Sequence, residues 1–232
     1  MSTHSHPLTH LPTLAARPDS RSLDLVFLLD TICSDETLDE RRKYVRNIIR
    51  NVSQDFPAEG HLRVGVIPYG PHHSAKMSFA KLSTETARIQ KFLRAQSAHP
   101  GGPFEAAYEE ALYGLYNLDW SRASHRVMVT VGHRPPHPYK PFSYREGDPF
   151  DCLGQQFCEK NLDWRLLLAP LRSHLRLRSI AVVCESNWTG QSSLTYTDEY
   201  ANFCWAEIGY TNLLNFDMTT AGEVARDILK LI

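Results

Sequence analysis

Two polar stretches of the chain, each placed directly after an apolar run, carry side chains that are able to bind a cation. Asp30 ends the run 24–30, and Ser34 follows it closely. His133 follows a second run, residues 126–131. Carboxylate and hydroxyl oxygens suit Mg²⁺, whereas imidazole nitrogen suits Zn²⁺. These residue types therefore allow either a Mg²⁺ site on Asp30 and Ser34 or a softer site that also uses His133.

Further histidines and one cysteine extend the softer alternative. His72, His73 and His137 also lie where strands are expected to end, and Cys33 lies in the loop after Asp30. Cys33 and His133 would form a nucleophile and base pair, as in a hydrolase, if the fold brought them together. The sequence contains no Gly-rich phosphate loop and no Gly-x-Ser-x-Gly motif. We therefore expect no enzyme, and we keep the Cys33/His133 pair as the catalytic alternative.

Composition excludes several classes of protein. The chain has 232 residues, 42% of them hydrophobic, and a net charge of −1, which argues against nucleic acid as a partner. No apolar run reaches the roughly 20 residues of a membrane span. Residues 1–22 are rich in Pro, Ser, Thr and His and lack the order of a signal peptide, so we expect a flexible arm and a cytoplasmic protein. The five cysteines show no CxxC pair, which argues against a disulfide framework.

The elements that must position these residues follow from the hydrophobic pattern. Short apolar runs alternate with amphipathic helical segments, which predicts an α/β fold with a doubly wound, mainly parallel central sheet and helices on both faces. The run 24–30 is nearly continuous in apolar residues between Asp24 and Asp30, as in a strand buried on both faces. Pro103 is expected to open the helix that carries Tyr108 and Leu112. Asp30 then lies at the carboxyl end of a central strand, where open α/β sheets bind ligands.

The segment 135–161 has no clear period and is longer than an ordinary connection, so we expect a functional insertion there. It is rich in aromatic residues, which together with arginine often anchor protein interfaces. The residues expected to bind a partner are Tyr139, Phe142, Tyr144, Arg145 and Phe150.

From residue 23 to residue 232 the chain resembles a von Willebrand factor A (vWA) domain. The resemblance rests on several segments in order. The main ones are residues 28–34 (Leu-Leu-Asp-Thr-Ile-Cys-Ser), 63–69 (Arg-Val-Gly-Val-Ile-Pro-Tyr) and 101–112 (Gly-Gly-Pro-Phe-Glu-Ala-Ala-Tyr-Glu-Glu-Ala-Leu). The resemblance implies a vWA-like domain over 23–232 and, in many such domains, a metal-ion-dependent adhesion site.

The family site takes Asp-x-Ser/Thr-x-Ser from its first loop, a Thr or Asp from its second and an Asp from its third. Asp30 and Ser34 match the first loop, but Ile32 offers no oxygen at its middle position. Gly102 and Pro103 stand in the second loop, and His133 replaces the Asp of the third. The resemblance therefore predicts a degenerate site with Asp30 and Ser34 acting as caps, or a weak Mg²⁺ or Zn²⁺ site with His133. No other cofactor is expected.

Such domains typically recognise proteins. The resemblance thus predicts a non-catalytic interaction module, an adaptor or scaffold in an intracellular multiprotein system. An AAA+ ATPase as partner is implied by the resemblance alone.

Overall fold

The structure of the chain is a computed structural model that describes residues 22–56, 61–72, 78–100, 105–137, 158, 160, 162–184 and 195–232, with the backbone alone at 195–199. Strands and helices alternate along it. The strands are β1 (Ser22–Asp30), β2 (His61–Tyr69), β3 (Ala80–Ser83), β4 (His125–Gly132), β5 (Arg178–Val183) and β6 (Leu213–Asn215). The helices are α1 (Asp35–Asp55), α2 (Thr86–Arg94), α3 (Tyr108–Leu115), α4 (Trp164–His174), α5 (Thr195–Gly209) and α6 (Ala221–Lys230).

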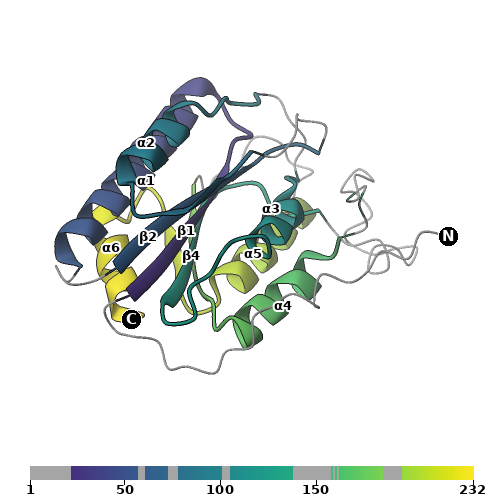
Figure 1. Cartoon of the computed structure of the whole chain (residues 1–232). Helices are drawn as coiled ribbons and strands as arrows, with labels where there is room; N and C mark the ends of the chain where they lie inside the picture. Colours follow the sequence, from purple (N-terminus) through teal and green to yellow (C-terminus); the bar gives the residue numbers. More distant parts are fainter. Residues whose placement is uncertain are drawn as a thin grey trace.

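The strands form one six-stranded sheet in the order β3-β2-β1-β4-β5-β6. Its strand pairs are parallel except for β2 and β3, which are antiparallel at the edge. Helices α1, α2 and α6 cover one face, and α3, α4 and α5 cover the other (Figure 1). The predicted doubly wound α/β fold is confirmed.

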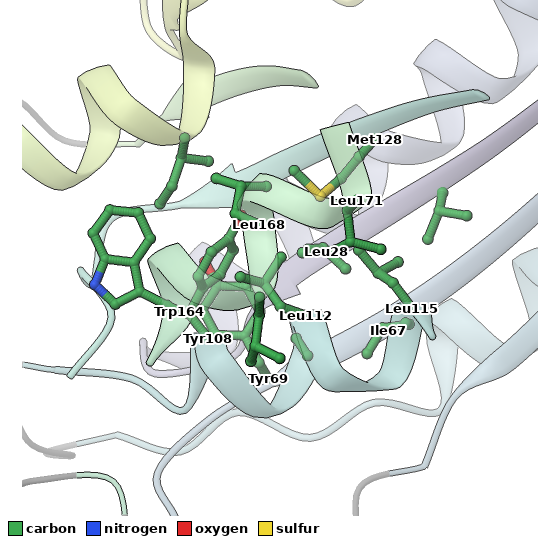
Figure 2. Close-up of a cluster of buried hydrophobic side chains, with 14 of the residues drawn as sticks. Leu28, Ile67, Tyr69, Tyr108, Leu112, Leu115, Met128, Trp164, Leu168 and Leu171 are labelled. Carbon is green, nitrogen blue, oxygen red and sulfur yellow. The ribbon is translucent and has the colours of Figure 1, made fainter. Parts of the chain in front are cut away.

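Strand β1 is apolar from Leu25 to Leu29 because both of its faces are covered. Leu25, Phe27 and Leu29 point into the core beneath α1 and α6. Val26 and Leu28 point into the opposite core, in which Leu28 lies among side chains of α3 and α4 (Figure 2). Every residue of the strand is buried. Since successive side chains alternate between the faces, a strand covered on both needs apolar residues at nearly every position.

The register of the central strands brings their carboxyl ends together. Asp30 pairs with Tyr69 of β2, and Leu29 pairs with Val131 of β4. A Cβ atom added to Gly132 would lie 2.4 Å from Cβ of Asp30. Only glycine therefore lets β4 end so close to Asp30.

One element begins later than the sequence predicts. Helix α3 starts at Tyr108 and not at Pro103. The residues before it bind neighbouring segments instead, since the amide of Ala106 donates to Pro135 O (2.9 Å) and that of Ala107 to Gly70 O (2.8 Å). These hydrogen bonds hold Ala106 and Ala107 against neighbouring segments, so the helix starts only after them.

Among the described residues, no helix combines the length and the apolar character that a membrane span requires. Residues 1–21 and most of the predicted insertion, including its five expected partner-binding residues, lie outside the described part of the chain.

Candidate functional site

The carboxylate of Asp30 is buried at the end of β1 and accepts hydrogen bonds from the backbone of two loops. The amide of Ile32 donates to Oδ1 at 2.8 Å. The amides of His133 and Arg134, just beyond β4, both donate to Oδ2 at 3.1 Å. Asp30 therefore holds the loops after two neighbouring strands together, as the capping alternative predicts.

A buried arginine faces the same carboxylate. Arg41 extends from the second turn of α1 and is fully buried. One of its terminal nitrogens, Nη1, donates to the carbonyl oxygen of Asp30 at 2.9 Å and lies 3.4 Å from Oδ2. The other, Nη2, lies 2.7 Å from Nδ1 of His133. We call Asp30, Arg41 and His133 the Asp30 centre.

The charge of Arg41 sets the ionisation of Asp30. Burial would raise the pKa of the carboxyl group, but the Arg41 charge and contacts with His133 outweigh it and lower the pKa to about 2. The carboxylate is therefore ionised at neutral pH, with a guanidinium as its counter-charge.

The contact with Arg41 also indicates the hydrogen-bonding role of Nδ1 of His133. Its Nδ1 lies 2.7 Å from Arg41 Nη2 and 3.0 Å from Asp30 Oδ2, and one ring nitrogen cannot accept from the first and donate to the second. Guanidinium nitrogens only donate, and the Asp30 oxygen already has two amide donors. We therefore assign Nδ1 as the acceptor of the Arg41 hydrogen bond. Because this contact engages Nδ1, that nitrogen is not available to act as a base for Cys33.

The residues present do not fit a Mg²⁺ ion at the Asp30 centre. A hard cation needs about six oxygen ligands. Ser34 is the N-cap of α1, and its hydroxyl accepts the amide hydrogen of Thr37 at 3.2 Å. Ile32 is buried in the apolar core. The nearby hydroxyl of Tyr69 is buried, which raises its pKa and keeps it neutral. Gly102 and Pro103 lie outside the described residues.

A second buried cluster lies at the same end of the sheet. Oε1 of Glu109 is 2.8 Å from Nε2 of His72 and 3.0 Å from Nδ1 of His137. The three side chains come from the loop after β2, the first turn of α3 and the loop after β4. All are at most 6% exposed. We call these three residues the Glu109 centre.

Glu109 is the residue of this centre that the sequence did not reveal. Both histidines were candidates for a soft metal, but Glu109 falls outside the apolar face of its helix and resembles an exposed residue. In the structure it is fully buried. Burial would raise the pKa of its carboxyl group, and contacts with His137 and His72 outweigh burial and lower it.

The neighbours of His72 favour a charged ring. Burial alone would lower its pKa, but contacts with Cys158, Glu109 and Glu110 outweigh burial and raise the pKa to about 11. With no metal bound, the ring carries a proton between two carboxylates. A cavity of about 280 Å³ opens beside it, lined among others by Glu110 and His99.

No family model matches the chain, and no curated protein matches it either. Solved structures do match. Proximal thread matrix protein 1 from the mussel byssus, in a structure with zinc in its MIDAS motif, is 13% identical with a TM-score of 0.54, covering 92% of this chain and 46% of that one. The vWF domain of the type V pili tip protein Mfa5 from Porphyromonas gingivalis is 11% identical (TM-score 0.57, 90% and 94% covered).

A third match, BatB from Bacteroides thetaiotaomicron, is 9% identical with a TM-score of 0.53, covering 90% of this chain and 98% of that one. The chain thus spans less than half of the mussel protein but nearly all of the two bacterial chains. At these identities the likeness concerns the fold alone. Together with the sheet order and the helices on both faces, it shows that the chain has a vWA-like fold.

Proposed function

We propose that this chain is a non-catalytic protein-interaction module whose adhesion position holds an arginine in place of a metal ion. The observation that carries this proposal is the buried contact of Arg41 with Asp30. A guanidinium is planar and always charged, so it neutralises a carboxylate at every accessible pH. It also carries five N–H donors for hydrogen bonds. The position that binds a cation in many vWA domains would then be closed, and partner binding would not require Mg²⁺.

The similar structures support partner recognition as the use of this fold. One is a pilus tip protein, and the mussel protein has a MIDAS motif that holds zinc. In this chain the equivalent oxygen ligands are in part absent, since Ile32 and His133 replace two of them. We therefore expect contacts between proteins that do not pass through a bound cation at Asp30.

The partner-binding surface belongs to the insertion after β4. Its aromatic residues and Arg145 follow a strand whose carboxyl end lies beside Asp30. Aromatic and arginine side chains dominate the energy of many interfaces. We propose that the chain acts as a cytoplasmic adaptor or scaffold in a multiprotein system, with an AAA+ ATPase as one class of partner.

Replacement of residues 138–150 by a Gly/Ser linker of equal length tests the surface. Tagged wild-type and variant chains are used for affinity purification with crosslinking and mass spectrometry, after urea unfolding has shown that both fold cooperatively. We expect the linker variant to lose the partner, and a chain lacking residues 1–21 to keep it. Undiminished capture by the linker variant would place the surface elsewhere.

The same capture tests the role of the Asp30 centre. We expect equal recovery with and without millimolar Mg²⁺, in buffers without a chelator so that any other bound metal is retained. Recovery that depends on Mg²⁺ would contradict the proposal. Turnover of a substrate that is lost on Cys33→Ser would instead favour the hydrolase alternative.

A further inference from the structure

The Glu109 centre has the donors and the arrangement of a transition-metal site. Two imidazole nitrogens and one carboxylate oxygen converge, and all three ligand atoms lie within 4.8 Å of one another. Four-coordinate zinc has bonds of about 2.0–2.1 Å, which places its ligand atoms about 3.3 Å apart. The distances from Oε1 of Glu109 to the two imidazole nitrogens, 2.8 and 3.0 Å, are shorter by only a few tenths of an ångström. Small side-chain movements would therefore make room for the ion.

We propose that His72, Glu109 and His137 bind one Zn²⁺ ion, at a position separate from the adhesion position at Asp30. The inference does not depend on the proposed function, because it concerns other side chains. Two nitrogens and one carboxylate oxygen suit zinc better than Mg²⁺ or Ca²⁺, which take oxygen ligands. The thiol of Cys158, also buried, lies beside His72 and adds to the soft character of the surroundings.

Backbone hydrogen bonds hold together the three segments that carry the ligand residues. The amide of Ala107 donates to Gly70 O, and the amide of Ala106 donates to Pro135 O. Each ligand residue lies two positions after one of these anchors: His72 after Gly70, Glu109 after Ala107 and His137 after Pro135. The positions of the ligands thus come from strand ends and backbone hydrogen bonds, which reduces the cost of ordering them when a metal binds.

The outer contacts of His72 orient its free nitrogen. Nδ1 of His72 lies 2.7 Å from Oε1 of Glu110, and Lys160 lies 2.5 Å from the other oxygen of that carboxylate. A metal-binding histidine commonly donates its second ring N–H to a carboxylate in this way. Among the described residues, Nε2 of His72 is buried and has no hydrogen-bond partner, although Glu109 Oε1 is close to it. An ion between these atoms would satisfy both.

A zinc ion would offset the charge of the buried carboxylate. Glu109 and Glu110 each contribute a negative charge, Lys160 pairs with Glu110, and two neutral imidazoles contribute none. The ion would thus neutralise mainly Glu109, which matters for a carboxylate with so little solvent around it. The cavity lined by His72 and Glu110 gives the ion a path of entry.

Zinc binding by the 232-residue chain tests the proposal. The chain is stripped of metal with EDTA, dialysed and titrated with Zn²⁺ by calorimetry, while elemental analysis gives the stoichiometry. We expect one Zn²⁺ per chain and a rise in melting temperature that EDTA reverses, because an ion that binds the folded chain preferentially stabilises it.

Four variants locate the ion. Glu109→Gln keeps the shape of the side chain and should weaken binding the most, while Glu110→Gln should weaken it by about 10- to 100-fold as the orienting carboxylate. His99→Ala, a histidine on the same cavity but outside the cluster, is the matched control and should bind zinc like the wild type. Equal affinity in wild type and Glu109→Gln, or loss of binding on His133→Ala alone, would overturn the proposal.

A measurement on the wild type alone tests the site without requiring that any variant folds. Two-dimensional ¹H–¹⁵N spectra of the histidine rings should show two rings whose nitrogen shifts change on addition of one equivalent of Zn²⁺. A spectrum in which no ring responds, or in which many respond weakly, would show scattered surface binding and contradict the assigned site.

Discussion

The Asp30 centre and the Glu109 centre lie at the same end of the sheet, and each buries one carboxylate. They differ in the groups that neutralise it. Asp30 faces a guanidinium, supported by three backbone amides. Glu109 faces two imidazoles and one backbone amide, that of His137 at 3.4 Å.

The difference has a chemical consequence. A guanidinium keeps its charge at every accessible pH and has no lone pair for a metal. An imidazole can exchange its proton for a metal ion. The Asp30 centre therefore has the character of a fixed structural ion pair, and the Glu109 centre has the donors of an exchangeable site. Asp30 is the residue that matches the family's metal site, and its carboxylate oxygens are already engaged by Arg41 and backbone amides.

The largest expected effect is on the Asp30 centre. We expect Arg41→Met to lower the free energy of unfolding by about 3–5 kcal/mol, because the Asp30 carboxylate stays buried without its counter-charge. Urea unfolding at neutral pH measures it. Lys43→Met is the control, since Lys43 and Asp39 form an exposed pair that contributes under about 1 kcal/mol. Equal losses in the two variants would show that Arg41 does not act as the counter-ion.

The second effect follows pH. The pKa of Asp30 is lowered from 3.8 to about 2 in the folded chain, so its contribution is present above about pH 4 and is lost as the pH falls through 2. The shift corresponds to about 2 kcal/mol. The pKa of Glu109 is also lowered, so both carboxylates contribute to the pH dependence of stability. Comparison of the wild type with Asp30→Asn isolates the contribution of Asp30. We expect the difference in unfolding free energy between wild type and this variant to shrink by that amount from pH 5 to pH 2. A difference that stays constant would contradict the low pKa.

A smaller effect distinguishes a cap from a ligand. We expect Ser34→Ala to cost about 1 kcal/mol of unfolding free energy, because the amide of Thr37 loses its acceptor. Ser53→Ala on the same helix is the matched control, since that hydroxyl only donates to the carbonyl of Ile49. Thermal melts measure both variants. A loss for Ser34→Ala that appears only when Mg²⁺ is present would mark Ser34 as a ligand.

The smallest expected effect is that of Mg²⁺ on the wild type. Millimolar Mg²⁺ should leave the melting temperature unchanged, since the oxygens of Asp30 are already engaged and weak binding adds almost no stability. Differential scanning fluorimetry with and without EDTA measures it. A reproducible rise reversed by EDTA would show that Asp30 and Ser34 do recruit enough ligands.

Local spacing determined much of the fold. The apolar run that ends at Asp30 predicted a buried central strand, and the structure confirms it. Ser34 caps α1, and the spacing of Thr220 and Glu223 gives α6 a capping box. Such features depend on residues a few positions apart, so a sequence reveals them directly. The resemblance to vWA domains likewise predicted the fold that the solved structures share.

The partners of the buried charges were decided only by the tertiary structure. Arg41 lies on a helix with many exposed charges, and its burial follows from the packing of α1 against the end of β1. Glu109 meets histidines 37 residues before it and 28 residues after it, because β2, α3 and β4 converge at one end of the sheet. No pattern within a short stretch of sequence predicts contacts between residues so far apart in the chain. The burial and ionisation of a charged side chain depend on what the fold brings around it, and therefore only the folded chain distinguishes the Asp30 centre from the Glu109 centre.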